Sequence, residues 1–350
     1  MSLDNLISQI RPLDADAMSA ARARQDTLTK PQGSLGRLEA LSVQVAGITG
    51  NPRPRLDHKV IVTMAGDHGV VAAGVSAYPQ EVTPQMVYNF LAGGAAINVL
   101  SRHVGARVVV VDMGVAAELD PHPSLVNKKV GLGTENMAAG PAMTREQTVR
   151  ALEAGASVVD AEFERGLDIL GVGDMGIGNT TPSAAIACAL TGEPASAVVG
   201  RGTGVDEAGL ARKIEAVENA LSVNQPDPHD GLDVLAKVGG FEIGGLAGAM
   251  LAAAAHQRPV VVDGFISTAA ALIAVTLAPQ IRPYLIAAHR SQEQGHHIML
   301  NWLGLQPLVD LDLRLGEGTG AALGISITEA SCKILDEMAT FAEAAVSERE

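Results

Sequence analysis

One acidic residue stands in a setting that suits proton transfer. Glu317 lies in residues 314–320 (RLGEGTG), where glycines on both sides leave room for a flat substrate to approach the carboxylate. An apolar wall from Leu315 is expected to raise the pKa of this carboxyl group toward the range useful for a general base. Taken alone, however, the segment slightly favours a surface turn with a solvated glutamate.

Two further glycine-rich segments suit a phosphate group. Residues 176–182 (GIGNTTP) join an apolar run to a helical stretch, and we expect Thr181 to cap that helix with Pro182 at its first position. Residues 200–206 (GRGTGVD) are similar and are followed by Lys213. Exposed amides and a nearby cation are what a phosphate needs, although one such loop is equally typical of a tight turn. Neither loop matches a Walker A motif or a dinucleotide fingerprint.

Other reactive residue types carry weaker signals. The adjacent histidines at 296–297 match no zinc-ligand spacing and favour the start of a helix. Cys188 and Cys332 lie in Ala- and Ile-rich helical stretches, which predicts buried, reduced thiols. Asp67 and His68 are neighbours in the chain and need not face one another, so we expect them to line or support a site.

The middle of the chain predicts the elements that would position these residues. Short apolar runs alternate with helical stretches, which is typical of a doubly wound parallel sheet buried on both faces. The runs are residues 60–64, 108–111, 167–172, 260–262 and 284–288. Gly, Asp and His follow them, at 66–69, 112–114, 173–176, 263–264 and 289–290. Such sheets bind ligands at the carboxyl ends of their strands, so a site is expected there.

Both ends of the chain are predicted to be helical. Residues 4–50 carry apolar side chains at helical spacing, and residues 51–54 (NPRP) interrupt the pattern. The Ala-rich tail after Gly320 is also helical in pattern. We therefore expect a small helical domain from residues 1–50 plus about 325–350, and a large α/β catalytic domain from residues 51–324.

Composition limits the class of partner. The chain has 350 residues, of which 47% are hydrophobic, and a net charge of −14. This charge argues against nucleic acid and against anionic membranes as partners, but a few local cations can still bind an anionic small molecule. Neither a secretory signal nor a long apolar span is apparent, so a cytoplasmic location is expected.

Several segments together resemble one family, the nicotinate-nucleotide–dimethylbenzimidazole phosphoribosyltransferases, often called CobT. Each segment alone is a weak signal, but their joint presence in this order is specific and extends over essentially the whole chain. The segments are residues 30–39 (KPQGSLGRLE), 66–70 (GDHGV), 74–83 (GVSAYPQEVT), 93–98 (GGAAIN), 173–181 (GDMGIGNTT), 200–204 (GRGTG) and 314–320 (RLGEGTG).

The resemblance implies a fold and a reaction. The expected fold is a Rossmann-like large domain with a small helical domain built from both chain ends, in a homodimer. The expected reaction moves the phosphoribosyl group of nicotinate mononucleotide to 5,6-dimethylbenzimidazole. It gives α-ribazole 5′-phosphate and nicotinate, for the lower ligand of cobalamin. No metal and no cofactor are expected, because no pyrophosphate leaves.

The resemblance also implies roles for particular residues. Glu317 would be the general base of an inverting displacement. Asp174 stands where some relatives carry Glu, and Arg314 is expected near the nicotinate carboxylate. The residues expected to line the benzimidazole pocket are Tyr78, Met86, Met175 and Leu315. Those expected to bind the nucleotide are Asp174, Gly176, Ile177, Gly178, Asn179, Thr180, Gly202, Lys213, Arg314 and Gly316.

Three alternatives are less well supported by the residues. An NAD(P)-dependent oxidoreductase predicts a dinucleotide fingerprint after the first strand, where residues 66–69 (GDHG) stand instead. A non-enzymatic nucleotide-binding protein would need no base. A phosphoribosyltransferase that uses phosphoribosyl pyrophosphate would need Mg²⁺ and, usually, paired acidic residues after a strand, of which Asp112-Met113 supplies half.

Overall fold

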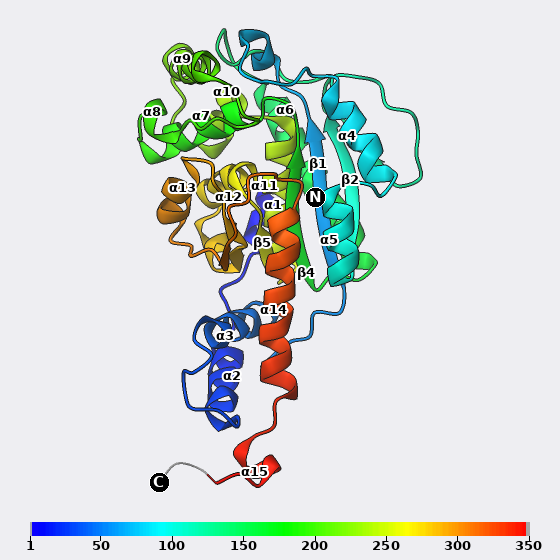
Figure 1. The fold of residues 1–350 in the computed structure, drawn as a ribbon, viewed down its shortest axis with the longest axis vertical. Coiled ribbons are helices and arrows are strands. Elements are labelled where there is room, and N and C mark those ends of the chain that lie inside the picture. Colours follow the sequence, from blue (N-terminus) through cyan, green and yellow to red (C-terminus); the bar gives the residue numbers. More distant parts are fainter. Residues whose placement is uncertain (1, 348–350) are drawn as a thin grey trace.

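The main sheet is parallel throughout and has six strands in the order β3-β2-β1-β4-β5-β6 (Figure 1). The computed structural model describes residues 2–347. The strands are β1 (Lys59–Gly66), β2 (Ala106–Gly114), β3 (Leu125–Asn127), β4 (Ile169–Met175), β5 (Val260–Val262) and β6 (Leu285–Ala287). This is the common strand order of the Rossmann fold, and its direction reverses between β1 and β4. The predicted fold class is therefore confirmed.

Side-chain alternation along the strands divides the core into two layers. On β1, Val60, Val62 and Met64 pack in one apolar cluster with α6 (Arg145–Glu164), α11 (Phe241–Ala255) and α12 (Phe265–Leu277). Ile61 and Ala65 pack in another, with α5 (Ala96–Val104) and α14 (Thr319–Glu337). Both faces of the sheet are covered, which is why its strands are continuous apolar runs.

Glycine allows the two most extensively packed helices to touch. A Cβ atom at Gly155 of α6 would lie 1.8 Å from the backbone oxygen of Gly245 on α11. A Cβ atom at Gly248 would lie 1.9 Å from the backbone oxygen of Leu152. Backbone-to-backbone approach of this kind fills the core without large rings, in keeping with an aromatic content of 3%.

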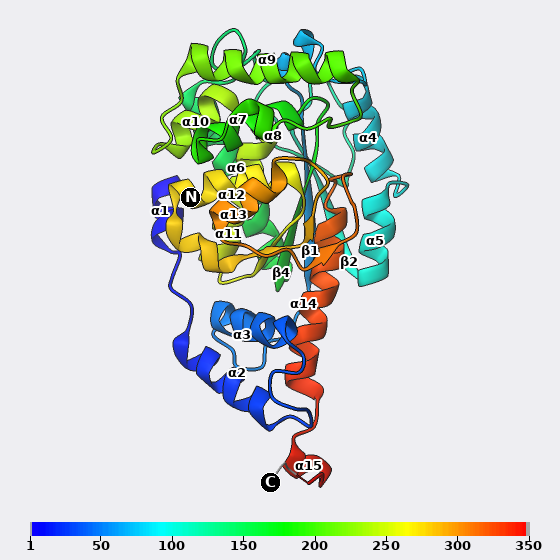
Figure 2. The same cartoon turned by 60° about the vertical axis from the view of Figure 1, so that its left-hand side comes forward.

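A smaller helical unit lies below the sheet (Figure 2). It combines α2 (Ala15–Thr27) and α3 (Arg37–Thr49) with the C-terminal part of α14, where Leu335 joins one apolar cluster with residues of α2 and α3. Arg24 donates to the backbone oxygen of Leu335 at 2.6 Å, and Arg53 pairs with Asp336 at 2.6 Å. Helix α1 (Leu3–Ser8) instead contacts α11 and α6, unlike the rest of the predicted residues 1–50. The division into two domains otherwise stays a prediction.

Among the described residues, no helix is long and apolar enough to cross a membrane. Cys188 and Cys332 are buried free thiols, as predicted, and burial raises the pKa of each to about 12.

The remaining helices and strands are α4 (Val82–Leu91), α7 (Thr180–Thr191), α8 (Ala195–Val198), α9 (Glu207–Asn224), α10 (Gly231–Val238), α13 (His296–Leu303), α15 (Phe341–Ala344), two 3-10 helices (Gly69–Ala73 and Pro279–Tyr284) and a small parallel pair, β7 (His289–Arg290) and β8 (Val309–Asp310).

Candidate active site

The loop that carries Glu317 is bound to the carboxyl ends of β1 and β4. The Glu317 amide donates to the backbone oxygen of Asp174 at 3.2 Å, and the Thr63 hydroxyl donates to the backbone oxygen of Glu317 at 2.9 Å. A Cβ atom at Gly173 would lie 2.3 Å from the carbonyl carbon of Glu317, so only glycine admits the loop here. Glu317 itself has a φ of 65°, which a non-glycine residue adopts at a cost of about 1–3 kcal/mol.

The Glu317 carboxyl group is buried, which corrects the expectation of a solvated surface turn. The residue is 5% exposed, and its Oε2 accepts from the Ile97 amide at 3.4 Å. Burial raises the pKa of this carboxyl group, and the negative charge of Asp263 raises it further. Leu315 was expected to provide the apolar wall, but its side chain is 57% exposed.

Two more carboxyl groups lie beside Glu317. Asp174 is buried at the end of β4, where its Oδ2 accepts from the Asn179 side chain at 2.9 Å and its Oδ1 has no partner among the described residues. Burial raises the pKa of Asp174 well above its ordinary range, and the charges of Asp263 and Glu317 add to the effect. A Cβ atom at Gly316 would lie 3.3 Å from both Asp174 oxygens, so the two predicted residues do meet.

Asp263 organises the start of α14 and was not among the predicted site residues. Its Oδ2 accepts from the Gly318 amide at 2.9 Å, and its Oδ1 accepts from the Ala321 amide at 3.1 Å. His289 lies 3.5 Å from Oδ1; burial lowers the pKa of this histidine, but Asp263 raises it more. Asp263 follows the run 260–262, and that position was the available signal.

A second group of residues gathers at the start of α7. The helix begins at Thr180 with Asn179 as its N-cap, so the predicted cap at Thr181 is wrong and Pro182 is third in the helix. The N-cap side chain binds Asp174 instead of a helix amide. Gly178 has a φ of 88°, a conformation that favours glycine and aims the turn away from β4.

Lys213 reaches this turn from α9. It is 1% exposed, and its Nζ donates to the Thr180 hydroxyl at 2.8 Å. A Cβ atom at Gly202 would lie 2.7 Å from that Nζ, and the Arg314 guanidinium donates to the Gly202 backbone oxygen at 3.4 Å. Burial lowers the pKa of Lys213 to about 8. Three segments that are far apart in the sequence, 173–181, 200–204 and 314–320, therefore meet around one lysine and one glutamate.

Asp67 and His68 support the site from separate positions. Asp67 accepts from the Thr83 hydroxyl at 2.7 Å and from the Ala116 amide at 2.8 Å. The Thr83 hydroxyl also lies 3.1 Å from the Ile177 amide, which connects Asp67 to the glycine-rich turn. His68 instead pairs with buried Glu242, with 2.8 Å between its Nε2 and Oε1 of the carboxylate.

The four residues expected to line a benzimidazole pocket differ in burial. Met86 and Met175 are half-buried and pack against the apolar cluster that includes Ile97, whose amide contacts Glu317. Tyr78 and Leu315 are 53% and 57% exposed and lie at the surface. The structure thus packs the two methionines against this cluster and leaves the other two side chains at the surface.

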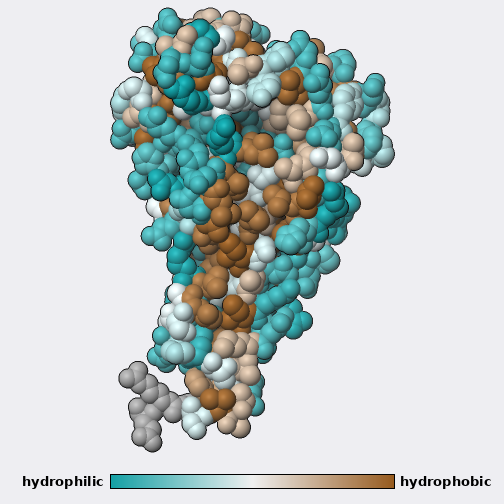
Figure 3. All heavy atoms as spheres, viewed as in Figure 1, coloured by the Kyte–Doolittle hydropathy of each residue, from teal (hydrophilic) through white to brown (hydrophobic). Residues whose placement is uncertain are grey.

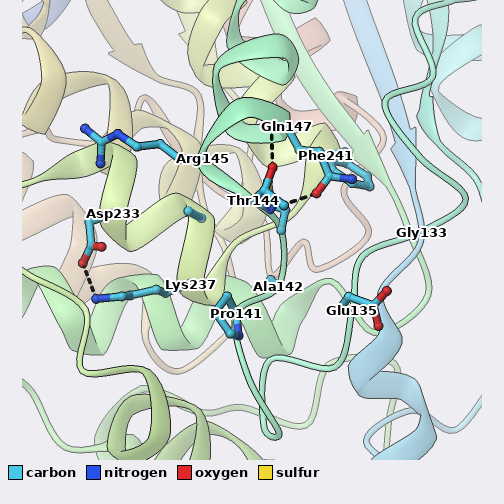
Figure 4. Close-up of a pocket in the computed structure, with 12 residues that line it drawn as sticks. Gly133, Glu135, Pro141, Ala142, Thr144, Arg145, Gln147, Asp233, Lys237 and Phe241 are labelled. Carbon is cyan, nitrogen blue, oxygen red and sulfur yellow. Dashed lines mark hydrogen bonds and ion pairs between the residues drawn. The ribbon is translucent and has the colours of Figure 1, made fainter.

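A cavity of about 630 Å³ lies apart from these residues, between the start of α6 and α10 (Figure 4). Two of its polar contacts are internal to the protein: the Lys237 ammonium group pairs with Asp233 at 2.8 Å, and the Thr144 backbone amide donates to the Gln147 side chain at 2.8 Å. None of the predicted site residues lines it. The perturbed carboxyl groups and the buried lysine lie elsewhere, so we assign the chemistry to the carboxyl ends of the strands.

Comparison with known proteins agrees with this geometry. A family model described as "Phosphoribosyltransferase" matches residues 10–346. The chain belongs to this phosphoribosyltransferase family. It is 66% identical to the nicotinate-nucleotide–dimethylbenzimidazole phosphoribosyltransferase of Roseiflexus sp. (strain RS-1), over 99% of the chain and 98% of the relative. The Geobacter sulfurreducens protein of the same name is 56% identical, with the same coverage.

A solved structure shows the same fold. The crystal structure of the nicotinate-nucleotide–dimethylbenzimidazole phosphoribosyltransferase from Thermus thermophilus superposes with a TM-score of 0.92. It is 48% identical in sequence and covers 96% of this chain and 100% of its own. The resemblance inferred from the motifs is confirmed, and the chain is an enzyme that transfers phosphoribosyl groups. The oxidoreductase and non-enzymatic alternatives are set aside.

Proposed function

We propose that this phosphoribosyltransferase moves the 5-phosphoribosyl group of nicotinate mononucleotide to 5,6-dimethylbenzimidazole. The products are α-ribazole 5′-phosphate and nicotinate, and they serve assembly of the lower ligand of cobalamin. The observation that carries the proposal is the junction of residues 173–181, 200–204 and 314–320 beside the buried carboxyl group of Glu317. The names of the relatives give the two substrates.

The chemistry of the displacement fits an acidic site. The bond between the ribosyl carbon and the nicotinate nitrogen breaks, and its electron pair neutralises the cationic ring. The ribosyl carbon becomes oxocarbenium-like, and a benzimidazole nitrogen attacks it from the opposite face, which inverts β to α. Buried carboxylates stabilise such developing positive charge far better than water does. Asp174, Asp263 and Glu317 are the groups placed to do this.

Glu317 has a second task in this proposal. The attacking benzimidazole carries a proton on its other nitrogen, and that proton must leave for the product to be neutral. A carboxylate with a raised pKa is a stronger base than an exposed glutamate, and burial gives Glu317 that property. Glu317 therefore accepts the proton as the new bond to the ribosyl carbon forms.

The nucleotide is held at the lysine end of the site. The phosphate lies against the turn of Gly176, Ile177 and Gly178, the start of α7, Gly202 and the Lys213 ammonium group. Asp174 and Asn179 face the ribose, and Arg314 with the backbone of Gly316 faces the nicotinate carboxylate. A bound phosphate would restore the full charge of Lys213, whose pKa burial has lowered to about 8.

The benzimidazole lies on the methionine side. Met86 and Met175 offer polarisable sulfur atoms to a flat ring, and Tyr78 and Leu315 close over it from the rim. Because both rim side chains are more than half exposed, ring binding would bury them and contribute hydrophobic stabilisation. No metal or other cofactor takes part in this proposal.

We also propose that the chain forms a homodimer. Figure 3 shows an apolar band along α14 and the adjoining α5. Val99 of α5 is exposed, as is Leu311 in the loop before Glu317. Large exposed apolar bands mark interaction sites, and a second copy of the chain is the partner proposed. Sedimentation equilibrium should give twice the mass of one chain; a single-chain mass at micromolar concentration would contradict the dimer.

The decisive experiment tests whether nicotinate is released from nicotinate mononucleotide only when the benzimidazole is present. The purified chain is incubated with nicotinate mononucleotide and EDTA, with and without 5,6-dimethylbenzimidazole, and nicotinate is measured by chromatography. We expect release only when the benzimidazole is present, together with equal amounts of the ribosylated product. Absence of turnover with every benzimidazole and purine tried would overturn the proposal.

A further inference from the structure

A second buried titratable group lies against the same Gly200–Gly204 loop as Lys213. Glu293 is 9% exposed, and its Oε2 is buried with no partner among the described residues. A Cβ atom at Gly200 would lie 2.3 Å from that oxygen, so the carboxyl group is pressed against the loop. The mechanism above gives this residue no role.

An ionised Glu293 would be unfavourable beside a bound phosphate. The carboxylate and the Lys213 ammonium group form no ion pair within 4.0 Å, so the lysine stabilises the ionised carboxylate only through a longer-range charge interaction. A phosphate dianion on Lys213 and Gly202 would add negative charge within a few ångströms of a carboxylate in a poorly solvated place. A protonated carboxyl group, in contrast, offers an O–H donor to a phosphate oxygen.

We infer that Glu293 is a further phosphate-binding residue, which takes up a proton when a phosphate monoester binds and donates a hydrogen bond to it. The inference rests on the proposed function, because it places the nucleotide phosphate at the Gly200–Gly204 loop. The unpartnered Oε2 is the atom that gains the proton. The proton comes from solvent, and no other bond is made or broken.

The charged surroundings of Glu293 agree with this role. Burial raises the pKa of its carboxyl group, whereas Lys213, the Gly202 backbone and Arg314 lower it in part. Two of these stabilising groups, Lys213 and the Gly202 backbone, are the ones that the phosphate would engage. Binding of the anion therefore withdraws their support for the ionised carboxylate and favours proton uptake.

The consequence is a pH dependence of nucleotide affinity. A group that must be protonated in the complex weakens binding as the pH rises above its pKa in the free protein, by up to about tenfold per pH unit. The Glu293→Gln variant keeps a hydrogen-bond donor of similar shape and has no proton to gain. Its affinity should therefore lose this part of the pH dependence.

The test measures binding of nicotinate mononucleotide to the full-length chain by calorimetry, at about pH 6 and about pH 7.5, in buffers of different ionisation enthalpy. The wild type should take up more protons per bound nucleotide than Glu293→Gln, by a substantial fraction of one proton. Its affinity should also weaken several-fold more between the two pH values. The matched control is Glu207→Gln, which removes one charge at the exposed start of α9, where Glu207 pairs with Arg201 of the same loop.

Three results would overturn the inference while nicotinate release from the nucleotide still supports the proposed function. One is equal proton uptake by the wild type and Glu293→Gln. Another is that Glu293→Gln binds nicotinate mononucleotide more tightly than the wild type by the same factor at both pH values. That result would mean that Glu293 stays ionised in the complex. The third is an infrared difference spectrum of the wild type that shows no new protonated carboxyl band on adding nucleotide; this reading holds even if the variant does not fold.

Discussion

At one end of the candidate site, buried Lys213 lies among glycine-rich turns. At the other end lie three carboxyl groups, those of Glu317, Asp174 and Asp263. Among the described residues, no cation contacts Glu317 or Asp174. Lys213 has its pKa lowered to about 8, and Glu317 and Asp174 have theirs raised. Burial is the largest cause at both ends, and it disfavours the charged form in each case. A substrate with an anionic phosphate and a cationic nicotinate ring would restore charge at both ends at once.

The comparison teaches that burial disfavours the charged form of the titratable groups at both ends, a cation at one end and carboxylates at the other. Each end alone would accept many ligands, since any phosphate suits a lysine and any cation suits carboxylates. A ligand with the two charges separated, as in the proposed substrate nicotinate mononucleotide, would satisfy both. Single substitutions can therefore alter one end at a time.

The largest effect on activity is expected at the end of the site that holds Glu317. Replacing Glu317 by Ala should lower kcat by about 10²- to 10⁴-fold, because the proton of the attacking benzimidazole has no acceptor. Binding of nicotinate mononucleotide, measured by calorimetry, should change little. Unchanged turnover would remove Glu317 from the mechanism, and lost binding would mean that the substitution disturbs the loop.

The next effect belongs to the lysine end. Lys213→Ala should raise the KM for nicotinate mononucleotide by about 10- to 100-fold, the loss typical of a charged hydrogen bond. The KM for the benzimidazole should stay near that of the wild type. Steady-state kinetics with each substrate varied in turn separates the two, and equal losses for both substrates would contradict the division of the site.

The pH profile of kcat/KM should be bell-shaped. Its rising limb reports ionisation of Glu317 and should lie above that of an exposed glutamate, because burial raises this pKa. Its falling limb should lie near pH 8, where Lys213 loses its proton. Each limb changes the rate by up to about tenfold per pH unit. Comparison in the Glu293→Gln background, where the proposed titration of Glu293 is absent, checks the assignment: Lys213→Arg should move only the falling limb upward.

The smallest effect is on stability. The pKa of Asp174 is raised in the folded protein, so the folded state binds more protons than the unfolded state, and stability falls as the pH rises through this range. Asp174→Asn removes that penalty and should raise Tm by roughly 2–6 °C at about pH 7, with a smaller difference at about pH 4. Activity should fall at the same time. A lower Tm at neutral pH would show that the carboxylate stabilises the fold.

Much of the scaffold was predictable from the sequence because buried parallel strands are local patterns. All five apolar runs form strands, and the glycine-rich segments lie at their carboxyl ends. Strand β3 was missed because Leu125–Asn127 is short and only half-buried. The cap at Thr181 was misplaced because the chain reaches helical geometry two residues earlier, with Asn179 as the N-cap and its side chain bound to Asp174.

The site was harder to predict than the sheet. The cause of the raised pKa of Glu317 was assigned to Leu315, a sequence neighbour, but burial against β1 and β4 and the charge of Asp263 account for it. Asp263 lies 54 residues before Glu317 in the chain, and its carboxylate accepts a hydrogen bond from the Gly318 backbone amide of the loop. Contacts between residues so far apart in the chain form only in the folded protein, and the spacing of residues in the sequence does not predict them.

Helix α14 has a mechanical consequence for the base. Its 19 residues correspond to about 28 Å, and it begins two residues after Glu317 while its far end is clamped by Arg24 and Arg53. For a rod of that length, a tilt of about 2° moves the tip by about 1 Å, a displacement that can cost about 100-fold in rate. In the proposed mechanism, the contacts of Arg24 and Arg53 at the far end of α14 would therefore help to fix the position of the Glu317 carboxyl group, together with the local hydrogen bonds of its loop.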